Sequence, residues 1–125
     1  MTEEIFKISK DERRANALKE MAKDRLKNFS SLKEPYRIIE EYYEIIKELL
    51  TAFMYNLGWK TLSHKALVDF ARENIKALST REIELVDELR VTRNNIVYYG
   101  ERVTLEFLKS REHPIKAIIE KLIRI

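Results

Sequence analysis

The stretch from Glu88 to Gly100 contains the residues of this chain that are best suited to chemistry. When successive residues are placed about 100° apart, as in an α-helix, its apolar side chains gather on one arc, and Arg93 lies inside that arc. The arc consists of Ile83, Val86, Leu89, Ile96 and Val97. A guanidinium does not lose its proton in proteins and is rarely buried without a partner. We therefore expect this face to meet a carboxylate, a phosphate or a hydrated groove.

Other polar side chains stand next to Arg93 on the same predicted helix. Arg90, Asn94 and Tyr98 follow one another at spacings of four, so they line one edge of the apolar arc. Tyr99 comes directly after them. The candidate ligand-binding residues are therefore Arg90, Arg93, Asn94, Tyr98 and Tyr99.

Several other kinds of site are excluded by what the sequence lacks. The chain has no cysteine, no glycine-rich phosphate loop and no paired histidines at metal-ligand spacing. We therefore expect neither a metal nor a cofactor. The two histidines are isolated in the sequence. We expect His64 to be a surface or capping residue in the first turn of a helix, and His113 to have a structural role directly before Pro114.

Composition predicts one helical domain spanning residues 1–125. The chain is 45% hydrophobic and 36% charged, with two glycines and two prolines, which leaves little punctuation for sheets. A net charge of +3 is compatible with a nucleic-acid partner, although many helical proteins are equally basic.

Acidic and apolar residues alternate near the N-terminus and no long apolar run occurs, so we expect a cytoplasmic protein without a membrane segment. The absence of glutamine and the abundance of Lys, Glu, Arg and Ile fit a thermophilic source.

Capping signals divide the chain into helices. Three capping boxes, Ser9 with Glu12, Ser31 with Glu34 and Ser79 with Glu82, precede apolar patterns of helical period, and Gly58 and Gly100 are placed to end helices. Together these signals predict helices over residues 10–28, 35–56, 62–78 and 80–99, a short helical pattern over 103–110 and a short helix from Pro114. The expected fold is an all-α, antiparallel up-and-down bundle of four main helices plus a short C-terminal helix.

The second predicted helix has the broadest apolar stripe in the chain. Its apolar side chains are Ile38, Ile39, Tyr42, Ile45, Ile46, Leu49, Leu50, Phe53 and Met54. A stripe of this width predicts burial on two sides, against the body of the domain and against another subunit.

The string from Arg93 to Gly100, which reads Arg-Asn-Asn-Ile-Val-Tyr-Tyr-Gly, resembles the signature of HEPN domains. These domains have an Arg followed by a polar residue, often Asn, and then a His a few positions later. The segment from Leu62 to Phe70 also resembles the third-helix region of archaeal members. The resemblance implies a bundle of four to five helices that forms a homodimer, with the two motifs facing each other across a cleft.

The same resemblance implies a function in phosphate chemistry. Active family members cut RNA without a metal: the Arg binds the phosphate, and the His transfers the proton. By resemblance Arg93 would bind phosphate with Asn94 beside it, and Tyr98 occupies the position of the His, so the candidate catalytic residues are Arg93 and Tyr98. A phenol with a pKa near 10 is a poor base at neutral pH. We therefore expect a dimeric protein that binds nucleotide or RNA phosphate with lost or weakened catalysis. Some relatives act as toxins or as partners of a small nucleotidyltransferase.

Two alternatives remain open from the sequence. In the first, the protein is a metal-independent ribonuclease in which Tyr98 or His64 replaces the missing histidine. In the second, it is a structural or protein-binding bundle, and Arg93 forms an internal ion pair, for example with a glutamate of the second helix. The groups within hydrogen-bonding reach of the Arg93 guanidinium distinguish these readings.

Overall fold

The structure, a computed structural model that describes residues 4–125, confirms the all-α bundle. Its helices are α1 (Glu12–Lys27), α2 (Pro35–Leu57), α3 (His64–Asn74), α4 (Thr80–Tyr99) and α5 (Leu105–Arg124). A 3₁₀ turn, Phe29–Ser31, joins α1 to α2, and two short strands, β1 (Ile5–Lys7) and β2 (Trp59–Thr61), complete the described part.

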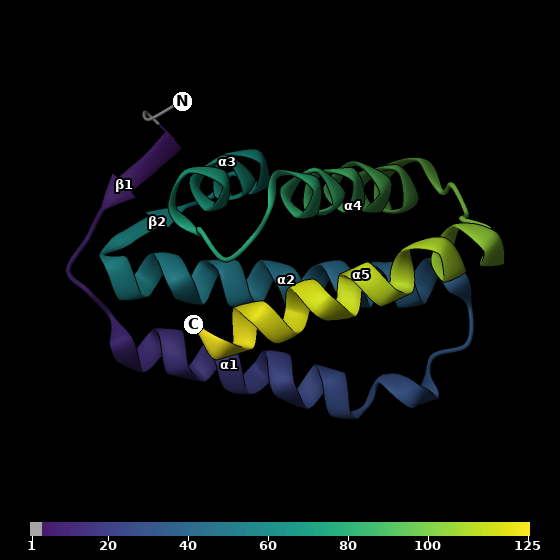
Figure 1. Cartoon of the computed structure of the whole chain (residues 1–125), viewed down its shortest axis with the longest axis horizontal. Coiled ribbons are helices and arrows are strands. Elements are labelled where there is room, and N and C mark those ends of the chain that lie inside the picture. Colours follow the sequence, from purple (N-terminus) through teal and green to yellow (C-terminus); the bar gives the residue numbers. More distant parts are fainter. Residues whose placement is uncertain (1–3) are drawn as a thin grey trace.

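Helix α2 is the centre of the bundle. Figure 1 shows α1 and α4 on opposite sides of α2, with α5 running across it, and α2 is in contact with all four other helices. Ten of its side chains are buried, on several sides of the helix. The broad apolar stripe is therefore buried on more than one side, as its width predicted, but the helices that cover it belong to the same domain; burial against another subunit stays a prediction.

The small antiparallel sheet was not predicted, and it fixes where α1 begins. Ile5 is opposite Thr61 in this sheet, and the chain that follows β1 runs along the end of α2. There the amide of Ile8 donates to the carbonyl of Gly58 at 2.8 Å. Gly58 has a left-handed φ of 82°, and a Cβ at this position would lie 2.9 Å from the Ile8 oxygen. Only glycine allows both the cap of α2 and this close contact.

Two of the three predicted capping boxes are wrong. Helix α1 is capped by Asp11, whose carboxylate accepts from the amide of Arg14 at 3.0 Å. The amides of Ile8 and Asp11 donate to carbonyls at the end of α2, so Ser9 between them lies outside the helix. Helix α2 begins directly at Pro35, and its N-cap residue Glu34 makes no side-chain cap. Ser31 instead lies in the 3₁₀ turn and donates to the carbonyl of Asn28.

The remaining helix boundaries agree more closely with the sequence. Ser79 and Glu82 form the predicted reciprocal capping box of α4, with bonds of 2.9 and 3.1 Å, and Gly100 ends this helix with a φ of 68°. Ser63 caps α3, with its hydroxyl oxygen accepting from the amide of Ala66 at 3.1 Å. Helix α3 ends at Asn74, earlier than predicted, although Ile75 and Leu78 beyond it are still buried.

The C-terminal helix is not short, which corrects the prediction of two separate segments. Helix α5 runs over 20 residues with Pro114 inside it. Proline in a helix interior removes one backbone hydrogen bond and strains the preceding turn. The helix continues because Leu108 and Ile115 are seven residues apart, so the buried stripes before and after Pro114 fall on one face. That face packs on α2.

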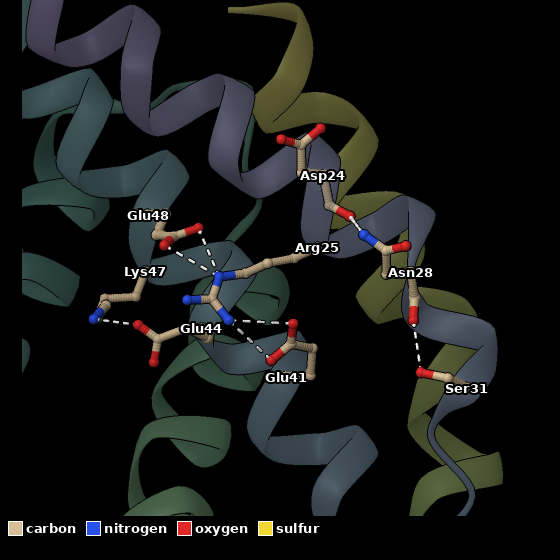
Figure 2. A network of polar contacts seen from close by, with 8 residues as sticks. All are labelled: Asp24, Arg25, Asn28, Ser31, Glu41, Glu44, Lys47 and Glu48. Atoms are coloured by element: carbon tan, nitrogen blue, oxygen red, sulfur yellow. Dashed lines mark hydrogen bonds and ion pairs between the residues drawn. The ribbon is translucent and has the colours of Figure 1, made fainter.

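Arg25 joins α1 to α2 through two carboxylates (Figure 2). Its Nε donates to both oxygens of Glu48 at 3.2 Å, and its Nη1 donates to those of Glu41 at 3.2 and 3.3 Å. Only 6% of Glu48 is exposed. Burial raises the pKa of Glu48 even though Arg25 lies against it, so the pair compensates for a carboxylate in an apolar setting.

Replacing Arg25 with methionine, which fills similar space without charge, is expected to destabilise the fold by leaving Glu48 without its cation. Breaking a fully buried ion pair costs roughly 3–5 kcal/mol. Because 34% of the Arg25 side chain is exposed, we expect a smaller loss of about 2 kcal/mol in the free energy of unfolding. Urea denaturation measures this loss.

The matched control is Lys23→Met, since Lys23 lies on the same helix and pairs with Glu20 at the surface. Its effect should stay within about 0.5 kcal/mol. The double variant Arg25→Met/Glu48→Met should recover part of the loss, because it removes the buried charge as well. If Arg25→Met and Lys23→Met were equally stable, the bridge would not hold α1 on α2.

Candidate functional site

The structure separates the five candidate residues into two groups. Arg90, Arg93 and Asn94 are half-buried, with their bases in the middle of α4. Tyr98 and Tyr99 lie at the C-terminal end of α4 and are 68% and 76% exposed. Val97, which was expected on the buried arc, is 46% exposed. Helix α3, with eleven residues against the twenty of α4, is too short to cover the whole of that face.

The two arginines of α4 lie close to side chains of α2 and α3. The ring of His64, on α3, is 5.9 Å from that of Tyr43 on α2. Burial raises the pKa of Tyr43 to about 12, and the positive charges of Arg90 and Arg93 oppose this shift. The same two arginines act on His64. Eight residues form this polar cluster: Tyr43, Glu44 and Lys47 of α2, His64 of α3, and Asp87, Arg90, Arg93 and Asn94 of α4.

Most charges of the polar cluster are already paired. Glu44 forms an ion pair with Lys47, and Asp87 accepts from the Nε of Arg90 at 2.9 Å. Arg93 differs from these residues. Its Nη1 donates over a long 3.4 Å to the side-chain oxygen of Asn94, and no carboxylate of residues 4–125 lies within 4.0 Å of its guanidinium. The internal ion pair considered from the sequence is therefore not formed in this part of the chain.

His64 is not the surface histidine expected from the sequence. It is the first residue of α3 and is half-buried beside Tyr43. Burial lowers the pKa of His64, and the cations of Lys47, Arg93 and Arg90 lower it further, while Glu44 opposes them. Its imidazole is neutral at pH 7 and can accept a proton. Sequence reasoning missed this position because no local pattern shows which part of α4 the start of α3 meets.

The polar cluster shares α2 with the Arg25 bridge. Figure 2 shows Glu44 and Lys47 on α2 beside Glu41 and Glu48, the two carboxylates that hold Arg25. On one polar stripe of α2, Glu41 and Glu48 therefore bind Arg25 of α1. The charges of Glu44 and Lys47, on the same stripe, act on the pKa of His64.

Two surface cavities lie away from Arg93. One, of about 480 Å³, lies between α1, α2 and α5 and includes Tyr42 and Glu112, which share a 2.5 Å hydrogen bond. The other, of about 620 Å³, lies between α4 and α5 and is lined partly by Glu88 and Arg111. Within residues 4–125, no group of three or more His, Cys, Asp or Glu side chains is arranged to hold a metal ion. No helix there has a stretch that is both long and apolar enough to cross a membrane.

Comparison with known proteins gives no relative: no protein-family model, no curated protein and no solved structure matches this chain. What the polar cluster does is therefore argued from its own chemistry. It combines an arginine without a carboxylate partner among residues 4–125, an amide next to it and an imidazole that is neutral at pH 7. These groups can bind an anion and exchange a proton with it.

Acidification is expected to destabilise the protein through His64. Because folding lowers the pKa of His64, the folded state favours the neutral ring. This contribution is complete above the unfolded pKa of about 6.5 and is lost as the pH falls through the folded value. We therefore expect Tm to fall below about pH 6.5 more steeply in the wild type than in His64→Gln, as measured by calorimetry.

His113→Gln is the matched control, since His113 is exposed on α5. It should keep the wild-type dependence of Tm on pH. Identical profiles for the wild type and His64→Gln would mean that the polar cluster does not act on His64 in the folded protein.

Proposed function

We propose that this protein is a HEPN-like homodimer that binds the phosphate groups of RNA or of a nucleotide at Arg93. The observation that carries the proposal is the state of Arg93: half-buried and without a carboxylate among residues 4–125. A guanidinium in such a setting is stabilised when an anion supplies the missing negative charge. Phosphate suits it because two oxygens can accept two parallel N–H bonds.

The neighbours of Arg93 support phosphate over other anions. Asn94 can turn its amide group to donate a further hydrogen bond, and Arg90 adds positive charge that Asp87 only partly cancels. The neutral His64 adds no negative charge that would repel a phosphate. The resemblance of residues 93–100 to the HEPN motif assigns the same role to Arg93.

A second copy of the chain would cover the exposed end of α4. Val97 is 46% exposed there, next to the more exposed Tyr98 and Tyr99, and Val91, nearer the middle of the helix, is 44% exposed. Tyrosine and apolar side chains of this kind are frequent in the core of protein interfaces. In the dimer that the resemblance implies, this surface lies between the two motifs, which would bring Tyr98 towards the partner's phosphate site.

Arg93→Gln is expected to weaken the binding of a labelled single-stranded RNA at least tenfold, since it removes a charge-assisted contact. The slope of log Kd against log salt concentration should also fall by about 0.7 for each phosphate contact that is lost. Fluorescence anisotropy at several salt concentrations measures both quantities.

Arg124→Gln, an equal change of charge at an exposed position of α5, should leave both quantities near the wild-type values. In a second arm, Val97→Glu should convert the dimer to a monomer in sedimentation experiments. RNA binding that is unchanged in Arg93→Gln, or equally reduced in Arg124→Gln, would contradict the site. A wild-type protein that sediments as a monomer would contradict the dimer.

The position of His64 favours a second candidate function, metal-independent cleavage of RNA. Its neutral imidazole, whose pKa is lowered by burial and by the charges of Lys47, Arg93 and Arg90, could take the proton of a ribose 2′-hydroxyl. The 2′-oxygen would attack the phosphorus, the bond to the 5′-oxygen would break, and that oxygen would receive a proton from the imidazolium. The products would be a 2′,3′-cyclic phosphate and a 5′-hydroxyl. Arg93 would stabilise the charge on the phosphate oxygens.

If the protein cuts RNA, His64→Gln is expected to reduce the rate at least a hundredfold, the usual contribution of general acid-base catalysis. Tyr98→Phe should have little effect, because a phenol is a poor general base at neutral pH. A quenched fluorescent RNA measures the rate in the presence of EDTA, and a substrate with one 2′-deoxy position tests the mechanism. Cleavage that survives in His64→Gln would exclude this histidine as the base.

A further inference from the structure

We propose that the cavity between α1, α2 and α5 binds a free amino acid with an apolar side chain. Its volume of about 480 Å³ lies in the range of ordinary small-molecule sites, about 300–1,000 Å³. Helices α1 and α5 both pack on α2, and the 3₁₀ turn Phe29–Ser31 contributes to the wall between them (Figure 1). Arg93 does not line this cavity, so the site is independent of the phosphate site proposed above.

The apolar part of the cavity wall is formed by Leu26, Phe29, Tyr42 and Ile119. The ring centroids of Phe29 and Tyr42 are 4.3 Å apart, with the ring planes inclined by 32°. Tyr42 and Ile119 are buried, whereas Phe29 is only half-buried. An apolar side chain in the cavity would remove the exposed part of this wall from water, and an aromatic one could stack on Phe29.

Glu112 of α5 supplies a carboxylate without a cation. The hydroxyl of buried Tyr42 donates to its Oε2 at 2.5 Å, and no cationic group of residues 4–125 lies within 4.0 Å of its oxygens. Burial raises the pKa of Tyr42, and the bond to Glu112 raises it further, so the phenol keeps its proton. Glu112 can therefore accept a hydrogen bond from a ligand while Tyr42 holds it in place.

Lys116 lies one turn beyond Glu112 on α5 and lines the same cavity. A Glu followed by a Lys four residues later is the favourable order for an ion pair on a helix. This pair is not formed, because the bond to Tyr42 holds the carboxylate of Glu112 against α2. Two opposite charges are thereby kept apart at one cavity.

A molecule that carries both charges matches these groups better than an ion of one sign. Lys27 of α1 also lines the cavity without an ion pair among residues 4–125, whereas Glu120 is paired with Arg124. An anion alone would leave Glu112 without a cation, and an amine alone would face two lysines. An α-amino acid carries its ammonium and carboxylate groups on one carbon, so the ammonium can bind Glu112 while the carboxylate binds Lys116.

NMR titration of the ¹⁵N-labelled chain with four compounds tests each contact, at about pH 6.5, where α-amino groups are protonated. L-phenylalanine should shift the amide signals of residues that line the cavity. Phenylalaninamide lacks the carboxylate and N-acetylphenylalanine lacks the ammonium, so each should bind about tenfold more weakly. L-alanine should also bind about tenfold more weakly, because it covers less of the apolar wall.

Variants assign the contacts to residues. Glu112→Gln should weaken the binding of L-phenylalanine about tenfold and keep the fold, because its amide oxygen still accepts from Tyr42. Lys116→Gln should weaken the binding of L-phenylalanine but not that of phenylalaninamide. Glu106→Gln is the matched control, at an exposed position of α5 outside the cavity, and should bind like the wild type. Arg93→Gln should do so as well.

Each of the contrary results would overturn a stated part of the proposal. If L-phenylalanine at millimolar concentrations did not shift the cavity signals of the wild type, or if Glu112→Gln bound no more weakly than Glu106→Gln, the site would be wrong. Equal affinity for L-phenylalanine and N-acetylphenylalanine would exclude the ammonium contact. If phenylalaninamide bound as tightly as L-phenylalanine, a free amino acid would not be the ligand class, and if L-alanine did so, the apolar wall would not select the side chain.

Discussion

The ion pair between Arg25 and Glu48 is the constraint that decides how the charged stripe of α2 is used. Helix α2 is in contact with every other helix, yet it carries a stripe of charged residues as well as its apolar faces. Glu48 in this stripe is buried, and a buried carboxylate needs a cation. Arg25 of α1 supplies it and binds Glu41 as well. Helix α1 is thereby held on one side of the stripe, and both Glu41 and Glu48 have Arg25 as their ion-pair partner.

The state of Arg93 follows from this arrangement. Of the remaining charges near the middle of α2, Glu44 is paired with Lys47, and on α4 itself Asp87 is paired with Arg90. The carboxylates that could have neutralised Arg93 therefore have other partners. Arg25 and Arg93 approach the same helix from different sides but are in different situations. Arg25 has two carboxylates and a structural role, whereas Arg93 has no carboxylate partner among residues 4–125.

The sequence predicted the elements of this fold where the signal was local. The capping box of Ser79 with Glu82 and the left-handed glycines Gly58 and Gly100 gave boundaries that the structure confirms. Signals that compete with packing were misleading. Pro114 indicated a break, but the heptad spacing of Leu108 and Ile115 keeps one buried face across it. The β-sheet could not be predicted, because its three-residue strands pair over more than fifty residues of chain.

The site was predicted in part, for the same physical reason. Helical periodicity places Arg90, Arg93 and Asn94 on one face of α4, and the structure keeps them together. Periodicity says nothing about which helix that face meets, so the approach of His64 from α3 was visible only in three dimensions. The tyrosines that continue the same pattern are exposed, because α4 extends beyond what the short α3 covers.

This geometry bears on where proton transfer can take place in the proposed homodimer. The proposed resemblance to HEPN domains assigns Tyr98 the position of the motif histidine, but Tyr98 lies five residues beyond Arg93, near the end of the helix, with most of its surface exposed. Within one subunit, the imidazole that lies near Arg93 belongs to His64. Tyr98 would reach a phosphate only across the interface, on the partner's Arg93. A general base must approach within hydrogen-bonding distance of the proton that it removes. A catalytic role for Tyr98 would therefore require the proposed dimer.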